Sequence, residues 1–270
     1  MNATASDTAP VRRARWPTFV GALALIAGLA IGVLALAAPL GVWLGIWDFR
    51  TGFNLLFNYA NAWGDIVALA AALIGVALLV LAFTIGVRPR YRPAVLAFVG
   101  AIAAFVGYAV PESYRPDEGI PPIHDISTDT VDPPRFVAVL PLRADAPNTA
   151  EYGRTPDMTP ERLAQLTREA YPDLTTVMLP VPPEQAFERA LAAVDALGWE
   201  LVAAVPTEGR IEATDTTFWF RFKDDIVIRI RGTDGGSEID ARSVSRVGVG
   251  DAGTNARRLR RFFAALTDGA

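Results

Sequence analysis

Apolar residues fill the first 110 positions in three long blocks, over residues 17–40, 66–87 and 93–110, and no block contains a charged side chain. A helix needs about 20 apolar residues to cross the hydrocarbon core of a bilayer. The blocks therefore predict an anchor of three transmembrane helices over residues 1–110. A cleaved signal peptide is the alternative for the first block, but its apolar run exceeds the roughly 7–15 residues usual for such a peptide.

The pattern changes after residue 110. Residues 111–135 contain six prolines, which block helix formation and favour extended backbone, so this stretch predicts a linker or arm. Beyond it, over residues 136–270, apolar positions recur with the periods of helices and strands. The chain therefore divides into an anchor, a Pro-rich arm and a second folded domain.

The elements of that domain follow from the periodicity and from Pro and Gly punctuation. Helices are predicted over residues 159–171, 182–197 and 252–266. Strands are predicted over residues 136–142, 199–205, 210–214, 217–223, 226–231 and 238–247, with a tight turn at Asp234-Gly235-Gly236. The order predicts an α+β domain in which helices cover one face of an antiparallel sheet.

The second face of this sheet is expected to be rich in cations. Its polar positions alternate with core positions such as Ile226, Ile228 and Ile230. The cations expected there are Arg210, Arg221, Lys223, Arg229, Arg231, Arg242 and Arg246, against the anions Glu212, Glu238 and Asp240. Such a face would attract an anionic ligand or partner. The alternatives are a solvated face with cross-strand ion pairs, and a face covered by the Pro-rich arm.

The amino-acid composition excludes several kinds of functional site. The chain has no Cys and one His, which excludes disulfides, thiolate metal sites and cysteine nucleophiles. Residues 110–270 carry 26 acidic and 18 basic residues, a net charge of −8, so we do not expect nucleic-acid binding. No cofactor and no metal site are expected.

Two short motifs carry the remaining candidate chemistry. "GVGDAG" at 248–253 lacks the second strand of a dinucleotide fold, but the helix start after it, with Arg257 and Arg258, could hold one anion. "HDISTDTVD" gathers His124 and Asp125 in the Pro-rich arm, where a docking strand is favoured over a metal or general-base site. We therefore assign no catalytic residue.

Basic residues in the short flanks predict the orientation of the anchor. They form two clusters: Arg12, Arg13, Arg15 and Arg88, Arg90, Arg92. Because Lys and Arg favour the cytoplasmic side, the N-terminus is expected in the cytoplasm and everything after residue 110 outside it. Gly21, Gly28 and Gly32 could pack closely against Gly75, Gly100 and Ala104, or make a dimer contact.

Several long segments resemble the family called domain of unknown function 1499. They are "PPIHDISTDTVDPPRF", "YPDL", "AFERALAAVDALGWELVA", "EGRIEATDTTFWFRFKDDIVIRI" and "DARSVSRVGVGDAGTNARRLRRF", and "LGIWDFRTGFNLL" resembles the outer loop of its three-span bacterial members. The resemblance implies a bacterial envelope protein. It supplies no activity, ligand or catalytic residue.

These observations predict a multi-pass protein of the bacterial inner membrane with a periplasmic α+β domain. We expect that domain to be non-enzymatic and to bind an anionic envelope component or a partner protein, with membrane lipid as a further partner. One alternative is an enzyme acting on lipid or cell-wall material at the outer leaflet, using His124 and neighbouring carboxylates. Another is a scaffold subunit of a membrane complex.

Overall fold

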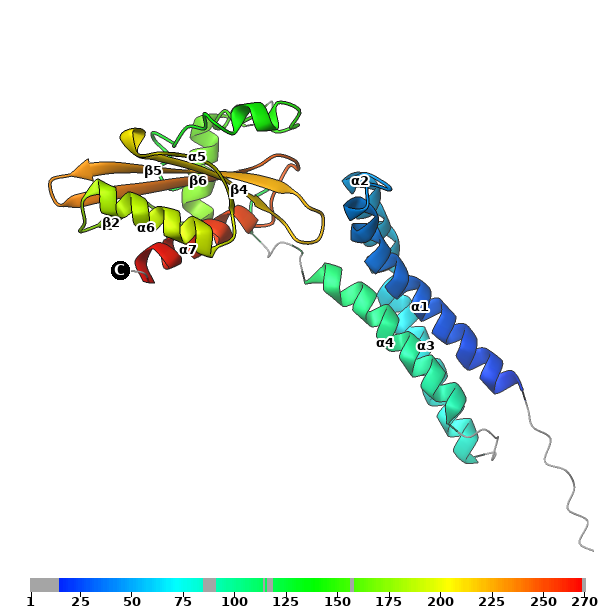
Figure 1. Cartoon of the computed structure of the whole chain (residues 1–270). Coiled ribbons are helices and arrows are strands. Elements are labelled where there is room, and N and C mark those ends of the chain that lie inside the picture. Colours follow the sequence, from blue (N-terminus) through cyan, green and yellow to red (C-terminus); the bar gives the residue numbers. More distant parts are fainter. Residues whose placement is uncertain (1–14, 85–90, 114, 116–118, 156–157, 269–270) are drawn as a thin grey trace, which may run out of the picture. The chain divides into compact units, whose positions relative to one another are not determined.

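The computed structural model describes residues 15–84, 91–113, 115, 119–155 and 158–268. The chain forms two compact units, Met1–Arg115 and Pro116–Ala270, each with its own packing (Figure 1). Of the basic residues used to predict orientation, Arg15 and Arg92 are described. Arg12, Arg13, Arg88 and Arg90 lie outside the described residues.

The first unit is helical. Its elements are α1 (Trp16–Trp43), α2 (Phe49–Phe53), a π-helix (Asn54–Asn61), α3 (Ala62–Thr84) and α4 (Arg92–Glu112). Helix α2, the π-helix and α3 are continuous, so three stretches are long and apolar enough to span a membrane: Trp16–Trp43, Phe49–Thr84 and Arg92–Glu112. These stretches contain the predicted blocks 17–40 and 93–110 and the described part, 66–84, of the block 66–87, and they indicate a multi-pass membrane protein.

Helix α4 packs against both α1 and α3. Helices α1 and α4 meet where each has a glycine: a Cβ on Gly28 would lie 1.9 Å from the carbonyl oxygen of Gly100. The pair therefore permits a backbone approach that any side chain would block. Gly75 of α3 lies instead against the ring of Phe98. The predicted close packing of small residues within the unit is confirmed for Gly28 and Gly100.

The second unit contains one antiparallel sheet. Its strands are β1 (Asp125–Ser127), β2 (Val177–Leu179), β3 (Glu200–Val205), β4 (Arg210–Thr216), β5 (Lys223–Thr233) and β6 (Gly236–Ser245). They follow the order β1-β6-β5-β4-β3. Strand β2 also pairs with β6, over Ser237–Ile239, whereas β1 pairs with β6 over Arg242–Val244. The helices are α5 (Pro160–Ala170), α6 (Pro183–Ala196) and α7 (Thr254–Asp268), with 3-10 turns at Leu140–Arg143 and Pro206–Glu208. The predicted α+β class is confirmed.

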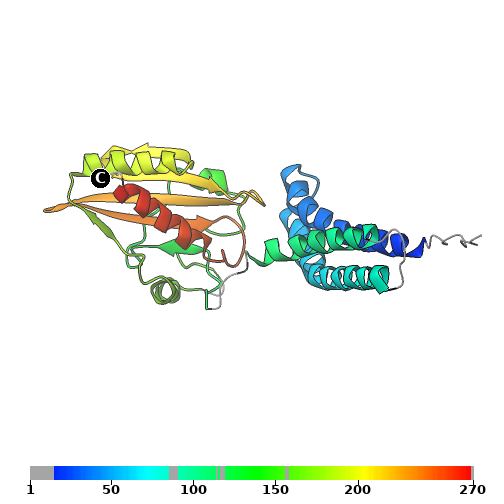
Figure 2. The ribbon, with the colours of Figure 1, turned by 90° about the horizontal axis from the view of Figure 1, so that it is seen from below.

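Helices α6 and α7 lie on one face of the sheet (Figures 1 and 2). The alternate residues of β5 that face them, Ile226 and Ile228, are completely buried. Trp199 stacks on Phe262 of α7 with ring centroids 5.9 Å apart. The core of the unit thus occupies the helix-covered face, as the alternation of the strands predicts.

Local signals fix the helix ends. The Thr159 hydroxyl accepts a hydrogen bond from the backbone N–H of Arg162, which caps α5. Gly198, with a φ of 70°, follows α6 in the left-handed conformation that glycine adopts without strain. Both ends lie where the sequence predicts them.

Two predicted strands are wrong. Residues 136–142 form a bend and a 3-10 turn, in which Pro141 occupies the first turn and the preceding backbone N–H groups bond to a side chain rather than to a strand. Residues 217–222 form a loop, because the backbone N–H of Thr217 donates to the carbonyl of Phe222 at 2.8 Å. Phe218, at one of the alternating apolar positions of the predicted strand 217–223, is 67% exposed in this loop.

The sequence did not predict strand β2, whereas β1 lies in the motif at 124–132, where a docking strand or arm was favoured. Each has three residues, too few to show a period of two. Strand β1 lies within residues 111–135, the segment expected to be a linker or arm, and pairs with β6. The division between the two compact units falls after Arg115, so nearly all of this segment belongs to the second unit.

Candidate functional site

The second face of the sheet is covered by the chain itself. Residues 128–152, here called the strap, cross it, and Phe136 and Val139 of the strap pack on Val227 and Val244 of the sheet. The sheet is therefore covered on both faces. Whether the cations expected on this face are available to a ligand depends on the strap residues that lie opposite them.

A buried carboxylate holds the middle of the strap. Glu212 of β4, fully buried, accepts hydrogen bonds from the backbone N–H groups of Val137, Ala138 and Val139 at 2.9–3.1 Å. Arg210 also pairs with this carboxylate, and with Glu208 at 2.8 Å. Consecutive N–H groups of this kind form an anion-binding concavity, and here the protein's own side chain fills it.

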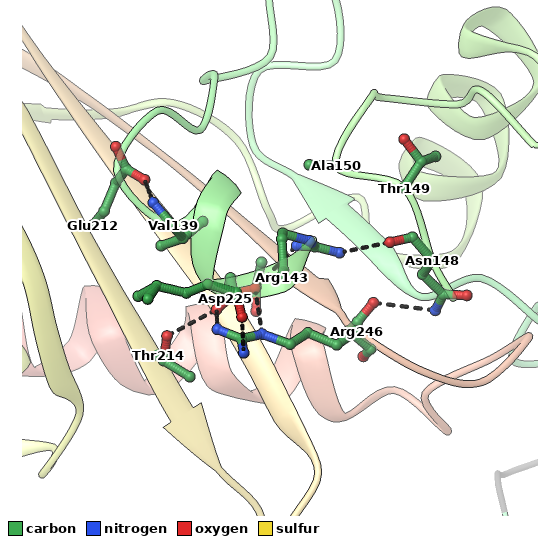
Figure 3. A network of polar contacts seen from close by, with 12 residues as sticks. Val139, Arg143, Asn148, Thr149, Ala150, Glu212, Thr214, Asp225 and Arg246 are labelled. Carbon is green, nitrogen blue, oxygen red and sulfur yellow. Dashed lines mark hydrogen bonds and ion pairs between the residues drawn. The ribbon is translucent and has the colours of Figure 1, made fainter. Parts of the chain in front are cut away.

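A second buried network lies beside it (Figure 3). Asp225 of β5, fully buried, pairs with Arg143 of the strap at 3.1 Å and with Arg246 at 2.8 Å, and the Thr214 hydroxyl donates to it. Arg143 also donates to the carbonyl of Asn148. Burial lowers the pKa of Arg143, and the Asp225 carboxylate opposes that shift. Arg246 is thus engaged inside the domain.

Arg242 is enclosed on all sides. Its guanidinium makes two 2.8 Å hydrogen bonds to Asp125 of β1 and lies between the rings of Phe136 and Tyr152, at 5.1 and 5.2 Å. It also donates to the carbonyl of Ala150. Two aromatic faces and a fork-shaped carboxylate contact make this a site for arginine specifically.

The start of the strap is held by a more exposed ion cluster. Arg229 pairs with Asp129 at 2.8 Å, Asp132 at 3.0 Å and Asp240 at 2.9 Å. Arg231, 43% exposed, pairs with Asp132 at 3.3 Å, and also with Glu238. The pKa of Asp129 is lowered: burial acts to raise it, but backbone N–H donors and Arg229 outweigh that effect.

Arg258 lies under the helix-covered face. It is buried and pairs with Asp224 at 2.6 Å and with Asp215 at 2.8 Å. Asp251, from "GVGDAG", accepts hydrogen bonds from the backbone N–H groups of Gly253 and Asn255 at 2.8 and 2.7 Å. Burial raises the pKa of Asp251, and those N–H donors oppose the rise. The expected anion position at the start of α7 is thus taken by a carboxylate of the chain.

The remaining candidate cations are exposed. Arg221 lies in the 217–222 loop with a φ of 56°, and Lys223, 47% exposed, lies 3.9 Å from Glu200. Arg257 donates to the carbonyl of Ala252 at 3.0 Å and to the Thr254 hydroxyl at 3.1 Å.

His124 and Asp125 do not form a shared site. The imidazole Nδ1 of His124 lies 3.1 Å from the carbonyl oxygen of Val249, whereas Asp125 is committed to Arg242. Ser245 and Asn255 lie near the carbonyl of His124 rather than its ring. In the part of the chain that the structure describes, no group of three His, Asp or Glu side chains is placed to hold a metal ion.

Sequence reasoning missed the partners of these arginines. Arg143 directly follows the predicted strand 136–142, and Asp224 and Asp225 fall between the predicted strands 217–223 and 226–231, so none of the three was a candidate residue. One signal was present: two adjacent carboxylates directly before the apolar run Ile226–Ile228 place one acid on each face of a buried strand. A buried acid needs a cation, and the strap and α7 supply one for each face.

A family model described as "Protein of unknown function (DUF1499)" matches residues 125–266. The match covers 142 of the 270 residues and takes in the whole sheet from the first residue of β1. It ends within α7. No curated protein matches the chain significantly.

Proposed function

Because the chain belongs to the DUF1499 family, whose function is unknown, we propose its role from its own residues: a non-enzymatic, membrane-anchored module that binds an anionic envelope component or partner protein. The proposed location is the bacterial inner membrane, with the N-terminus in the cytoplasm and the second unit in the periplasm. The arginine clusters flanking the apolar blocks support this orientation.

One observation carries the proposal: Arg221, Lys223 and Arg257 are exposed and lie at one end of the sheet. Arg221 and Lys223 lie in and directly after the loop that joins β4 to β5. Arg257 is in the first turn of α7, next to Arg258, which reaches Asp224 at the start of β5. Exposed cations grouped in this way attract anions.

A binding role fits the polar groups better than a catalytic one. General acid–base catalysis needs a titratable group within hydrogen-bond reach of a reacting atom. His124 instead contacts a backbone carbonyl, and the buried carboxylates are saturated by arginines and backbone N–H groups. These networks fix the strap to the sheet and are structural in kind.

Photo-crosslinking in native membranes tests the proposal. We would place a benzophenone amino acid at Val249, which is 81% exposed and precedes α7. The expected result is a crosslink to an anionic lipid, glycan or protein. The triple variant Arg221→Glu, Lys223→Glu, Arg257→Glu should reduce that crosslink strongly.

The matched control changes the same charge elsewhere, with Arg135→Glu, Arg154→Glu and Arg162→Glu, all at exposed positions. This control should crosslink like the wild type. Equal crosslinking in both triple variants would overturn the proposal, because charge at the end of the sheet would then not matter.

A further inference from the structure

One end of the second unit, here called the linker end, brings together segments that are far apart in sequence. The register pairs Asp125 with Val244 and Val244 with Asp225, so the first residue of β1, the end of β6 and the start of β5 lie side by side. The 217–222 loop, joining β4 to β5, is at the same end. The chain from the membrane helices enters the domain at this end, through His124.

The 217–222 loop exposes two of its side chains, Phe218 and Arg221, while Phe220 is buried. Thr217 makes three hydrogen bonds across the loop. Its N–H donates to the carbonyl of Phe222, and its carbonyl accepts from the N–H of Arg221. Its hydroxyl accepts from the N–H of Phe222. Arg221 adopts a φ of 56°, which is uncommon for a residue with a side chain. The backbone of the loop is thus largely satisfied within itself.

Apolar surface is exposed at the linker end. Phe218 is 67% exposed and packs edge-on against Trp219, with ring centroids 5.3 Å apart. Val249, in the loop before α7, is 81% exposed. Trp and Phe beside cations are the composition that favours the headgroup layer of a bilayer, where an aromatic body and a charged tip are both accommodated.

The charge of the linker end suits an anionic surface. Arg221, Lys223 and Arg257 are exposed there. The carboxylates of the same end are mostly engaged: Asp224 and Asp215 pair with Arg258, and Glu200, 66% exposed, lies 3.9 Å from Lys223. Exposed positive charge therefore accompanies the exposed apolar side chains.

We propose that the linker end docks on the bilayer, with Phe218 and Trp219 in the interfacial layer and Arg221, Lys223 and Arg257 on the headgroups of anionic phospholipid. This inference rests on the proposed function and names its ligand. A lipid ligand is favoured over a soluble partner because the linker is short. The twelve residues between Glu112 and Asp125 can span at most about 40 Å even when fully extended, so the membrane is always within reach at high effective concentration.

The absence of cysteine from the sequence makes a depth measurement direct. Phe218→Cys would be labelled with a nitrobenzoxadiazole fluorophore, which replaces one ring by another. Met178→Cys, 56% exposed and paired with Glu238 far from the linker end, is the control position. Each full-length chain is placed in phosphatidylcholine nanodiscs with and without phosphatidylglycerol, and quenching by a nitroxide just below the headgroups is measured.

We expect several-fold stronger quenching at position 218 than at position 178, and an increase when phosphatidylglycerol is present. Adding Arg221→Glu, Lys223→Glu and Arg257→Glu should lower the docking equilibrium on the order of a hundredfold, since each cation near an anionic surface contributes about fivefold or more. The triple variant Arg135→Glu, Arg154→Glu, Arg162→Glu is the charge-matched control and should dock normally.

Equal quenching at positions 218 and 178, or quenching at 218 that ignores lipid charge, would overturn the inference. The proposed function has a separate outcome. If Val249 still crosslinks to an anionic glycan or protein in native membranes, binding of an anionic partner stands and only the lipid assignment falls. If the charge-dependent crosslink is also missing, both fall.

Discussion

The cations beneath the strap and those of the linker end belong to the same folded unit, but their surroundings are opposite. Arg242 and Arg246 are enclosed by carboxylates, carbonyls and rings, whereas Arg221 and Arg257 are exposed. The first set fixes the strap to a face of the sheet that would otherwise be exposed. Only the second set has charge directed to the outside. Whether an arginine stabilises the fold or is exposed to a ligand thus depends on what the rest of the chain places opposite it.

The largest expected effect comes from removing the shared acid of the buried network. Asp225→Ala leaves Arg143 and Arg246 buried without their carboxylate, and should destabilise the second unit by about 3–5 kcal/mol. Pulse proteolysis of the full-length chain across a urea series measures this as a shift in midpoint. The exposed Asp145→Ala is the control, and a shift no larger than that of this control would contradict the structural role.

A smaller effect is expected from a change that keeps the charge. Arg242→Lys retains a cation but loses the two-point contact with Asp125 and the fit between Phe136 and Tyr152, a loss of about 2 kcal/mol. The same urea series measures it, with Arg154→Lys on the surface as the matched substitution. Wild-type stability of Arg242→Lys would show that charge alone suffices at this position.

Acid should loosen the start of the strap. The pKa of Asp129 is below its ordinary value of 3.8 in the folded chain, so its contribution is complete above that value and is lost as the pH falls through the lower, folded pKa. We expect pepsin to cleave the strap faster as the pH falls below about 4. Asp129→Asn should cleave faster throughout and show a flatter pH profile. A profile parallel to that of the wild type would exclude Asp129 as the titrating group.

The smallest effect on stability is expected at the linker end. Reversing the charge of Arg221, Lys223 and Arg257 should change the unfolding free energy by about 0.5 kcal/mol or less per site, because exposed ion pairs contribute little. Binding to anionic membranes should nevertheless be lost. A large loss of stability in this variant would place these residues with the structural set and remove the contrast.

The sequence by itself determined much of this protein. Charge-free apolar blocks must become membrane helices, because a lipid core tolerates little else, and the three blocks are the three apolar helices of the structure. The helices of the second unit were equally legible, since Thr159 and Gly198 mark ends that depend on neighbouring residues alone. Alternation along β5 also placed Ile226 and Ile228 in the core.

Only the tertiary structure decided which charged side chains pair with one another. Arg143 meets Asp225 across 82 residues, and Asp125 meets Arg242 across 117, so neither pair leaves a local pattern. The strap forms no strand, because N–H groups of its middle donate to Glu212 instead of to a neighbouring strand. Periodicity reports the burial of apolar groups, which each residue expresses locally, whereas the pairing of a buried charge depends on a partner that only the fold brings near.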